Sequence, residues 1–318
     1  MGKVEVICFG EALIDFVSTE SGVALRDARG FVRAAGGAPA NVAAGLGKLG
    51  VKVAFMGMVG SDEFGAHLQE VLAKNNVDTS FMKTTNKANT TLAFVSLRKN
   101  GERDFAFYRN PGADLLFSVA DVAEAAFDGA KVFHFGSLSL AAEPAHTATI
   151  HCVELAREKG VIISYDPNWR PPLWPSSQAA RNNMLLGLKY ADWLKVSEEE
   201  LLFITQVQDE DKAVKWLMRH GPKLICVTRG AKGAAVWFNE THLNMPGRKV
   251  KAVDTTGAGD AFWAAFIKKL LVHGSMQNFT EASLREALRY AVVAGSVCVT
   301  AKGGIPALPT AEEIESCL

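Results

Sequence analysis

This 318-residue sequence lacks a surplus of charge of either sign, since 34 Lys and Arg residues balance 34 Asp and Glu residues. Proteins that bind nucleic acids or anionic membranes usually carry a basic excess, so we expect neither partner. No apolar run reaches the roughly 18 residues that a membrane-spanning helix needs. Because Glu5 interrupts the short N-terminal apolar run, that run indicates a first strand rather than a signal peptide. We therefore expect a cytoplasmic protein.

Several motifs of cross-linked, metal-binding and nucleotide-binding proteins are also missing. The five cysteines include no Cys-x-x-Cys pair, and the seven histidines show no metal-ligand spacing. No Gly-x-x-x-x-Gly-Lys-Ser/Thr loop occurs. Residues 45–50 match Gly-x-Gly-x-x-Gly, but they follow a predicted helix and precede a strand, the reverse of the order in a dinucleotide site. These absences argue against a disulfide framework, a structural zinc ion, a P-loop enzyme and a nicotinamide-dependent oxidoreductase.

What is present is an alternation of strand-like and helix-like segments. Strands are expected at residues 4–9, 53–59, 132–135, 161–165, 193–196 and 224–228. Helices are expected at residues 41–49, 63–75, 144–159, 177–189, 211–219, 261–273 and 283–300. This alternation predicts the α/β class, with a Rossmann-like, mainly parallel sheet flanked by helices and ligands beyond the carboxyl ends of its strands. Residues 234–238 are expected to add an antiparallel edge hairpin.

Residues 17–35 and 89–110 interrupt the alternation. The second stretch is rich in strand-forming residues and has a turn signal at 99–101. One interpretation is a small β-sheet outside the main sheet, which would close over a site and exclude water. Ordinary edge hairpins of the main sheet explain the same pattern equally well.

The most informative segment is Asp254-Thr255-Thr256-Gly257-Ala258-Gly259-Asp260, which leads into an apolar helix-like run. Small residues at a helix start leave backbone N–H groups free to bind an anion at the positive end of the helix dipole. Asp260 adds a carboxylate to the same turn. The segment thus combines an anion site with a base, as phosphoryl transfer to a hydroxyl requires. The alternative is a simple N-cap followed by a buried helix.

A second segment, Gly36-Gly37-Ala38-Pro39-Ala40-Asn41, precedes a helix of small residues. Its glycines permit close approach of a ligand, and Asn41 offers both a donor and an acceptor, as a sugar requires. A tight turn into a helix explains the segment as well. Asp15, expected at the end of the first strand, would accept hydrogen bonds from two neighbouring hydroxyls, although a solvated loop carboxylate is an equal interpretation.

Three further segments carry candidate ligand contacts. Residues 166–174 contain Arg170, whose planar guanidinium suits a phosphate or a sugar oxygen. Arg109 follows an aromatic pair and is a second candidate, although a lone arginine is more often a surface charge. The Gly-rich turn at 228–233 would accommodate a nucleotide, or simply form a hairpin.

With these segments in place, the chain resembles the ribokinase-like (PfkB-type) carbohydrate kinases over nearly its whole length. Residues 36–41 are similar to the N-terminal di-glycine signature of that family, and residues 254–260 are similar to its C-terminal signature. The resemblance implies one ribokinase-like domain over residues 1–318, with a β-sheet lid from about residues 16–35 and 89–112. It also implies transfer of the γ-phosphoryl group of ATP to a sugar hydroxyl.

The resemblance further implies roles for individual residues. Asp260 becomes the catalytic base, and the amides of Gly257, Ala258 and Gly259 hold the charge that develops during transfer. Sugar-binding positions fall on Asp15, Gly36, Gly37, Asn41, Phe107, Arg109 and Arg170. Nucleotide-binding positions fall on Asn168, Lys195, Ser197, Thr228, Gly230 and Gly233.

Two cation sites follow from the same resemblance. Mg²⁺ accompanies ATP, with Glu200 in the acidic position of the family's Asn-x-x-Glu motif and acting through water. Ser197 stands where that motif has Asn, a form similar to the fructokinase branch. Asp254, with backbone carbonyls near residues 301–304, resembles the monovalent-cation site of some members, so K⁺ activation is a hypothesis.

Substrate and assembly are also expectations from the resemblance. Residues 107–114 and 166–174 are similar to the fructokinase branch, which makes D-fructose, phosphorylated at its 6-hydroxyl, the expected substrate. The 2-keto-3-deoxygluconate kinases share an aromatic-aromatic-Arg segment and an arginine equivalent to Arg170, so an acidic sugar is the main alternative. A non-catalytic sugar-binding protein is the alternative from another class. A homodimer through the lid strands, common in the relatives, is left open.

Overall fold

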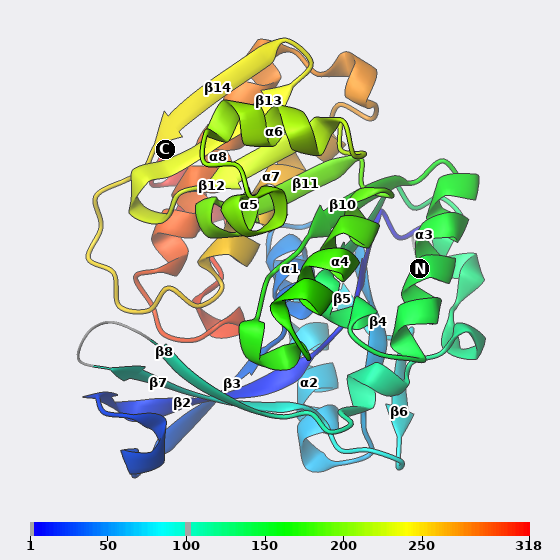
Figure 1. Ribbon diagram of the computed structural model, residues 1–318, viewed down its shortest axis with the longest axis vertical. Helices are drawn as coiled ribbons and strands as arrows, with labels where there is room; N and C mark the ends of the chain where they lie inside the picture. Colours follow the sequence, from blue (N-terminus) through cyan, green and yellow to red (C-terminus); the bar gives the residue numbers. More distant parts are fainter. Residues whose placement is uncertain (1–2, 99–102) are drawn as a thin grey trace.

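The expected apolar runs form the parallel core of a ten-stranded sheet in the computed structural model, which describes residues 3–98 and 103–318 (Figure 1). The strand order is β14-β13-β12-β11-β10-β9-β1-β4-β5, with β6 also paired to β4. The parallel strands are β1 (Val6–Phe9), β4 (Val53–Gly60), β5 (Val77–Asp78), β6 (Met82–Thr85), β9 (Val132–Gly136), β10 (Ile162–Asp166), β11 (Trp193–Ser197) and β12 (Leu224–Thr228). The antiparallel hairpin is β13 (Gly233–Phe238) and β14 (Thr241–Pro246), so the expected edge hairpin is confirmed.

Helices cover both faces of this sheet. One face carries α1 (Ala38–Lys48), α2 (Glu63–Lys74), α7 (Ala258–Leu271), α8 (Glu281–Cys298) and the short α9 (Ala311–Glu315). The other face carries α3 (Ala145–Glu158), α4 (Ser177–Leu188), α5 (Glu198–Thr205) and α6 (Glu210–Met218). Each face buries its own apolar cluster, as expected for a sheet covered on both sides. The predicted fold class is confirmed.

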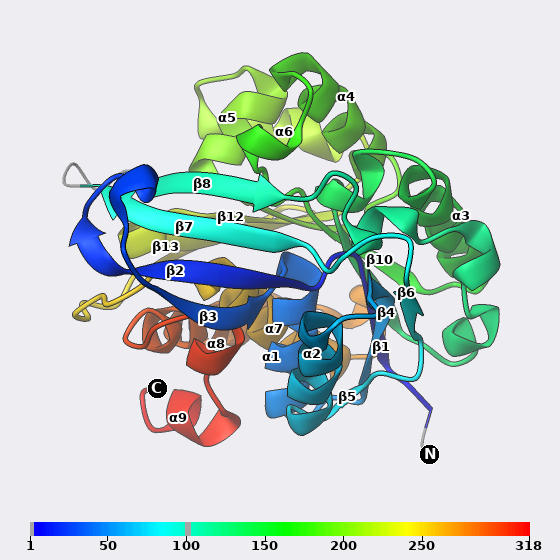
Figure 2. The same ribbon diagram turned by 90° about the horizontal axis from the view of Figure 1, so that it is seen from below.

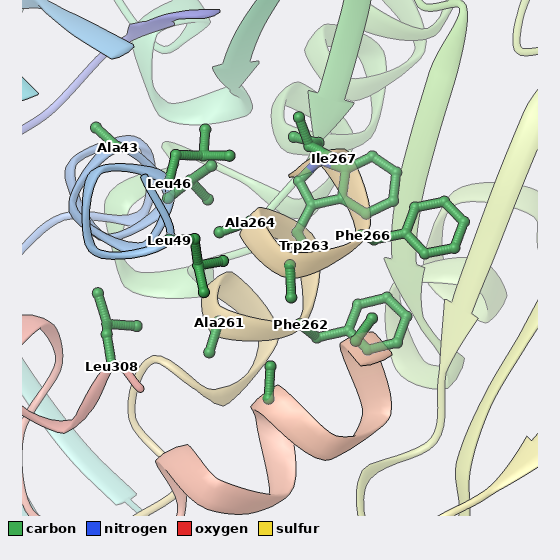
Figure 3. Packing of buried hydrophobic residues seen from close by; sticks show 14 of the residues in the cluster. Ala43, Leu46, Leu49, Ala261, Phe262, Trp263, Ala264, Phe266, Ile267 and Leu308 are labelled. Atoms are coloured by element: carbon green, nitrogen blue, oxygen red, sulfur yellow. The ribbon is translucent and has the colours of Figure 1, made fainter. Parts of the chain in front are cut away.

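Helix α1 packs against α7 on one face of the sheet (Figure 3). The packing is close because Gly45 of α1 faces Ala264 of α7, and a Cβ added at Gly45 would lie 2.8 Å from the Ala264 Cβ. Gly47 meets a second element, because a Cβ there would lie 2.0 Å from the Asn75 carbonyl oxygen. Gly45 and Gly47 therefore serve close packing, whereas Gly50, with φ +81°, has no atom within 4 Å of an added Cβ.

A second sheet of four strands lies apart from the first (Figure 2). Its strands are β2 (Leu13–Gly22), β3 (Phe31–Gly36), β7 (Leu92–Arg98) and β8 (Arg103–Tyr108), in the order β3-β2-β7-β8. The small sheet predicted from the two interrupting stretches is confirmed, and the alternative of edge hairpins on the main sheet is wrong. The turn predicted at 99–101 lies outside the described residues.

Several predicted boundaries need correction. Asp15 does not end the first strand, because β1 stops at Phe9 and Asp15 lies within β2, paired with Ala34 of β3. The chain turns at Gly10, whose φ of +142° suits glycine. Helix α7 begins at Ala258, three residues earlier than expected, while α5 and β14 were not predicted. Among the described residues, no helix combines the length and apolarity that crossing a membrane requires.

Candidate active site

A cavity of about 430 Å³ lies between the main sheet's loops and the inner face of the second sheet. Most of the predicted site residues line it, namely Asp15, Gly37, Asn41, Phe107, Asn168, Arg170, Lys195, Ser197, Glu200, Thr228, Gly257, Gly259 and Asp260. Residues from both halves of the chain therefore meet in one cleft, beyond the carboxyl ends of the main strands, as the fold class predicts.

The N-terminus of α7 forms one wall of this cleft. Gly257 is the N-cap residue in the left-handed conformation, with φ +79°, and no side chain caps the helix. The Ala258 N–H donates a long hydrogen bond to the Thr255 carbonyl oxygen at 3.4 Å, and no side chain occupies the other N–H groups of the first turn. This helix end can therefore bind an anion. Asp254 shapes the preceding turn, because its carboxylate accepts hydrogen bonds from the Thr256 N–H at 2.9 Å and the Gly303 N–H at 3.0 Å.

Asp260 lies in that first turn and is only 6 % exposed. Its Oδ2 accepts a hydrogen bond from Asn41 Nδ2 at 2.8 Å, and its Oδ1 accepts one from Asn168 Nδ2 at 3.4 Å. Burial raises the pKa of Asp260 to about 6, although the Lys195 ammonium opposes this rise. A carboxylate tuned toward neutral pH is suited to accept a proton from a hydroxyl.

The di-glycine turn is fitted closely to its surroundings. A Cβ at Gly37 (φ +101°) would lie 2.4 Å from the Glu11 carbonyl oxygen, and one at Gly36 would lie 2.2 Å from Asp15 Oδ2. This turn leads into α1, which carries Asn41. Asn41 Oδ1 is buried and has no hydrogen-bond partner among the described residues. Its capacity to accept a hydrogen bond is therefore unused, and contact with a ligand hydroxyl stays a prediction.

Lys195 is a buried cation beneath the α7 N-terminus. Its Nζ donates to Asp166 Oδ2 at 2.6 Å, and a Cβ placed on Gly259 would lie 3.2 Å from the same nitrogen. Burial by itself would lower the pKa of Lys195, but Asp166, Glu200 and Asp260 together raise it. The ammonium therefore stays charged at the point where an anion would meet the helix.

Ser197 and Glu200 begin α5 as a capping box. Ser197 Oγ accepts a hydrogen bond from the Glu200 N–H at 3.1 Å, and Glu200 Oε2 accepts one from the Ser197 N–H at 2.8 Å. Glu200 Oε1 accepts from the Trp169 N–H at 2.7 Å. Glu200 thus ties the loop after β10 to the end of β11, and its cleft-facing carboxylate leaves lone pairs for water.

The donor set in the cleft fits a Mg²⁺ ion that is carried by ATP. Within residues 3–98 and 103–318, no three His, Cys, Asp or Glu side chains gather to hold a metal ion by themselves. Mg²⁺ in kinase sites is usually held by phosphate oxygens, water and one or two carboxylates. Glu200 is the carboxylate placed to contact such water, and this role stays a prediction.

The two predicted arginines lie in different environments. Arg170 lines the cleft, and its Nη1 donates to the Trp169 carbonyl oxygen at 3.1 Å. Arg109 is not among the lining residues, because its guanidinium is buried against Asp114. Burial alone would lower the pKa of Arg109, but the Asp114 carboxylate raises it. The structure does not bring Arg109 to the cleft surface.

The Gly-rich turn after β12 has a structural explanation. Thr228 lines the cleft, whereas Gly230 and Gly233 are not among the lining residues. Gly233 opens β13 with φ +102°, and a Cβ there would lie 2.0 Å from the Met245 carbonyl oxygen of β14. Gly230 has φ +55°. The hairpin itself thus requires these glycines, and their nucleotide contact stays a prediction.

Glu11 is one of the lining residues that our sequence reasoning missed. It is 3 % exposed, and its Oε1 accepts a hydrogen bond from the Ala38 N–H at 3.1 Å, at the start of α1. Burial raises the pKa of Glu11 to about 7, while Arg109 acts to lower it. The signal was its position just beyond β1, since polar residues after parallel strands gather at the same edge of the sheet.

The chain is similar to known carbohydrate kinases. The sequence model described as pfkB family carbohydrate kinase matches residues 3–311. A probable fructokinase-5 of Arabidopsis thaliana is 46 % identical over 314 residues, which cover 98 % of this chain and 97 % of that protein.

Two solved structures are also similar. The fructokinase of Xylella fastidiosa with bound ATP has a TM-score of 0.87 and 35 % identity, and covers 98 % of this chain and 97 % of its own. A fructokinase double mutant from Vibrio cholerae O395, in a form with bound fructose, ADP and potassium ion, has a TM-score of 0.87 and 28 % identity. It covers the same shares of the two chains.

Proposed function

The chain belongs to the pfkB family of carbohydrate kinases, and from that premise we propose that it is an ATP-dependent fructokinase producing fructose 6-phosphate. The observation that carries this proposal is the position of Asp260. It is buried at the uncapped N-terminus of α7, with a pKa raised toward neutral pH, beside the free acceptor of Asn41. A base, an anion site and a hydroxyl-binding group thus lie within one cleft.

In the proposed reaction the 6-hydroxyl of fructose attacks the γ-phosphorus of ATP in line. The new O–P bond forms as the bond to ADP breaks, and Asp260 accepts the hydroxyl proton. The amides of Gly257, Ala258 and Gly259 stabilise the equatorial oxygens of the transferred group. A bound Mg²⁺ would neutralise phosphate charge. The second sheet would act as a lid that excludes water from the donor.

The arrangement of the arginines favours a neutral sugar over an acidic one. A 2-keto-3-deoxygluconate kinase must compensate the carboxylate of its substrate, and two arginines were expected near the sugar. Arg170 lines the cleft, whereas Arg109 lies beneath the surface of the cleft, where the Asp114 carboxylate neutralises its charge. The single guanidinium at the cleft supports fructose as the first substrate to test.

A substrate panel with Mg-ATP tests the proposal. ADP release is followed with fructose, 2-keto-3-deoxygluconate, ribose and glucose. We expect the highest kcat/KM with fructose and little ADP without sugar. If kcat/KM is highest with 2-keto-3-deoxygluconate, the acidic sugar and not fructose is the substrate. Sugar binding without ADP formation would instead identify a non-catalytic sugar-binding protein.

We also infer a monovalent-cation site at Asp254 and the loop at residues 301–304. The Asp254 carboxylate accepts a hydrogen bond from the Gly303 N–H, which keeps that loop beside it. The solved Vibrio fructokinase that binds potassium supports this inference. We expect faster turnover in potassium-only than in sodium-only buffer, and equal rates would remove the site. A homodimer and a cytoplasmic location stay predictions.

A further inference from the structure

A buried ion pair lies at the root of the second sheet. Arg109 donates to Asp114 Oδ2 from Nε at 2.9 Å and from Nη2 at 2.5 Å, and the two side chains are 4 % and 3 % exposed. The other carboxylate oxygen of Asp114 accepts a hydrogen bond from Thr91 Oγ1 at 2.6 Å. Arg109 Nη2 also donates to the Leu138 carbonyl oxygen at 3.1 Å. Every oxygen of Asp114 therefore has a partner.

These residues occupy the points where the second sheet joins the rest of the molecule. Thr91 immediately precedes β7, and Arg109 immediately follows β8. Asp114 belongs to the short 3₁₀ helix Ala113–Leu116. Leu138 follows β9 of the main sheet. Two strands of the second sheet are thus tied, through one carboxylate and one guanidinium, to the main sheet.

The third crossing point carries a charge as well. Glu11 lies two residues before β2, where the chain passes from the main sheet to the second sheet. It is buried, and the charges of Arg109 and Asp114 both act on it. Its Oε1 holds the first turn of α1, the helix that carries Asn41. Glu11 therefore lies within electrostatic range of the ion pair, at the root of β2 and beside the start of α1.

A contribution to stability alone does not explain such a cluster. Removing a buried ion pair from water costs about as much as the pair's attraction returns, so apolar residues of similar size would stabilise the fold equally well. A two-pronged arginine–carboxylate pair adds fixed geometry instead. Fixed geometry matters here because Val95 of β7 and Phe105 and Phe107 of β8 line the cleft.

We infer that Thr91, Arg109 and Asp114 form the anchor of the lid, and that Asp114 is a positioning residue for phosphoryl transfer. The inference rests on the proposed kinase function. By holding the roots of β7 and β8, the anchor sets Phe105 and Phe107 over the sugar and excludes water from the phosphoryl donor. In this anchor Arg109 acts by holding Asp114, and this role replaces the predicted contact of Arg109 with the sugar.

Two variants test the anchor. Asp114→Asn keeps the shape of the side chain and removes its charge, and Thr91→Val removes one hydrogen bond. We expect Asp114→Asn to raise the KM for fructose on the order of 10- to 100-fold, with the KM for ATP within about twofold. We also expect ADP to exceed fructose phosphate, because water reaches the donor. Thr91→Val should act in the same direction and more weakly, and it preserves the test if Asp114→Asn fails to fold.

A stability control separates positioning from general damage. Leu217→Ala leaves a cavity in α6, which packs against α5 and β12 away from the anchor, and lowers the melting temperature. This control variant should still form ADP and fructose phosphate in equal amounts. Folded anchor variants with unchanged fructose KM and unchanged ratio would overturn the inference, as would the same ratio change in Leu217→Ala. If the wild-type protein forms no sugar phosphate, the proposed function fails together with the inference. If the wild-type protein forms ADP and fructose phosphate in equal amounts and the anchor variants behave like it, only the inference about the anchor is refuted.

Discussion

Asp260 is the residue on which the proposed chemistry depends most. Its carboxylate is removed from solvent, held by two amide side chains and placed over the uncapped end of a helix. Each of these features has a separate cause: packing of α1, the loop after β10, and the small residues before α7. The residue type could be predicted from the motif, whereas its tuned pKa depends on neighbours that are far away in the sequence.

Replacing this carboxylate should abolish turnover without harming the fold. We expect Asp260→Asn to lower kcat by ~10²–10⁴, the usual range for a positioned acid–base group. Folding raises the pKa of Asp260 from 3.8 to about 6, so the folded protein favours the protonated carboxyl group. This contribution to stability is present below about pH 4 and is lost as pH rises from about 4 to 6. The variant should therefore be more stable at pH 7, by at most about 3 kcal/mol. Steady-state kinetics and urea unfolding measure both effects, and near-wild-type turnover would refute the assignment.

The same pKa predicts how activity depends on pH. A protonated Asp260 accepts no proton from the sugar, so activity should fall as pH decreases through about 6. The acid limb of kcat/KM reports this pKa in the free enzyme. Asn168→Ala removes a hydrogen bond to the carboxylate and should move the limb to higher pH. A limb near the ordinary aspartate pKa of about 4 in the wild-type protein would contradict the burial argument.

The contact between α1 and α7 is the element-level feature that assembles the cleft. Asn41 lies in the first turns of α1 and Asp260 in the first turn of α7, and their buried side chains meet because Gly45 lets the helices approach closely. Figure 3 shows Ala264 of α7 directed toward Leu46 of α1 and Leu49, which follows that helix. Local sequence predicts both helices, but it does not predict that they touch.

A methyl group at this contact should separate the helices. We expect Gly45→Ala to destabilise the protein by about 1–3 kcal/mol through overpacking, after the helix-propensity gain of about 1 kcal/mol is included. Turnover should fall too, because the Asn41–Asp260 hydrogen bond lengthens. The second change Ala264→Gly restores the space, so the double variant should recover turnover. Thermal unfolding and kcat report the two effects, and full activity in Gly45→Ala would show that the contact is not critical.

The cleft exists only because the two sheets face each other, and the residues that line it come from distant parts of the sequence. Its walls come from β2, β7 and β8 on one side and from α1, α7 and the loops after β10 and β11 on the other. Ligands that fill it contact both sheets and bind the folded state alone. Folding and ligand binding are therefore coupled.

This coupling predicts one unfolding transition that responds to ligand. We expect a single thermal transition, and we expect fructose with ADP to raise it. At 100 times Kd a ligand adds about 2.7 kcal/mol to the free energy of unfolding. Differential scanning calorimetry is the measurement, with glucose as the control sugar. Two separate transitions, of which only one responds, would show that residues 1–318 do not unfold as one domain.

Sequence alone was sufficient for the elements with strong local signals. Long apolar runs predicted the parallel strands, and small residues before Asp260 predicted a helix that begins at an anion site. The two stretches that interrupt the alternation of strand-like and helix-like segments also predicted the second sheet. The boundaries of β1 and α7, the capped helix α5 and strand β14 were missed, because capping boxes and backbone turns at glycine leave only weak patterns.

The sequence by itself determined the fold class, the two signature segments and which carboxylate to propose as base, because periodicity and residue chemistry are local properties. Only the tertiary structure decided what each charged side chain does. Arg109 and Arg170 look alike in the sequence, yet one is buried against Asp114 and the other lines the cleft. The physical reason is that a charge acquires its role from the partners and solvent around it, and these come from residues distant along the chain.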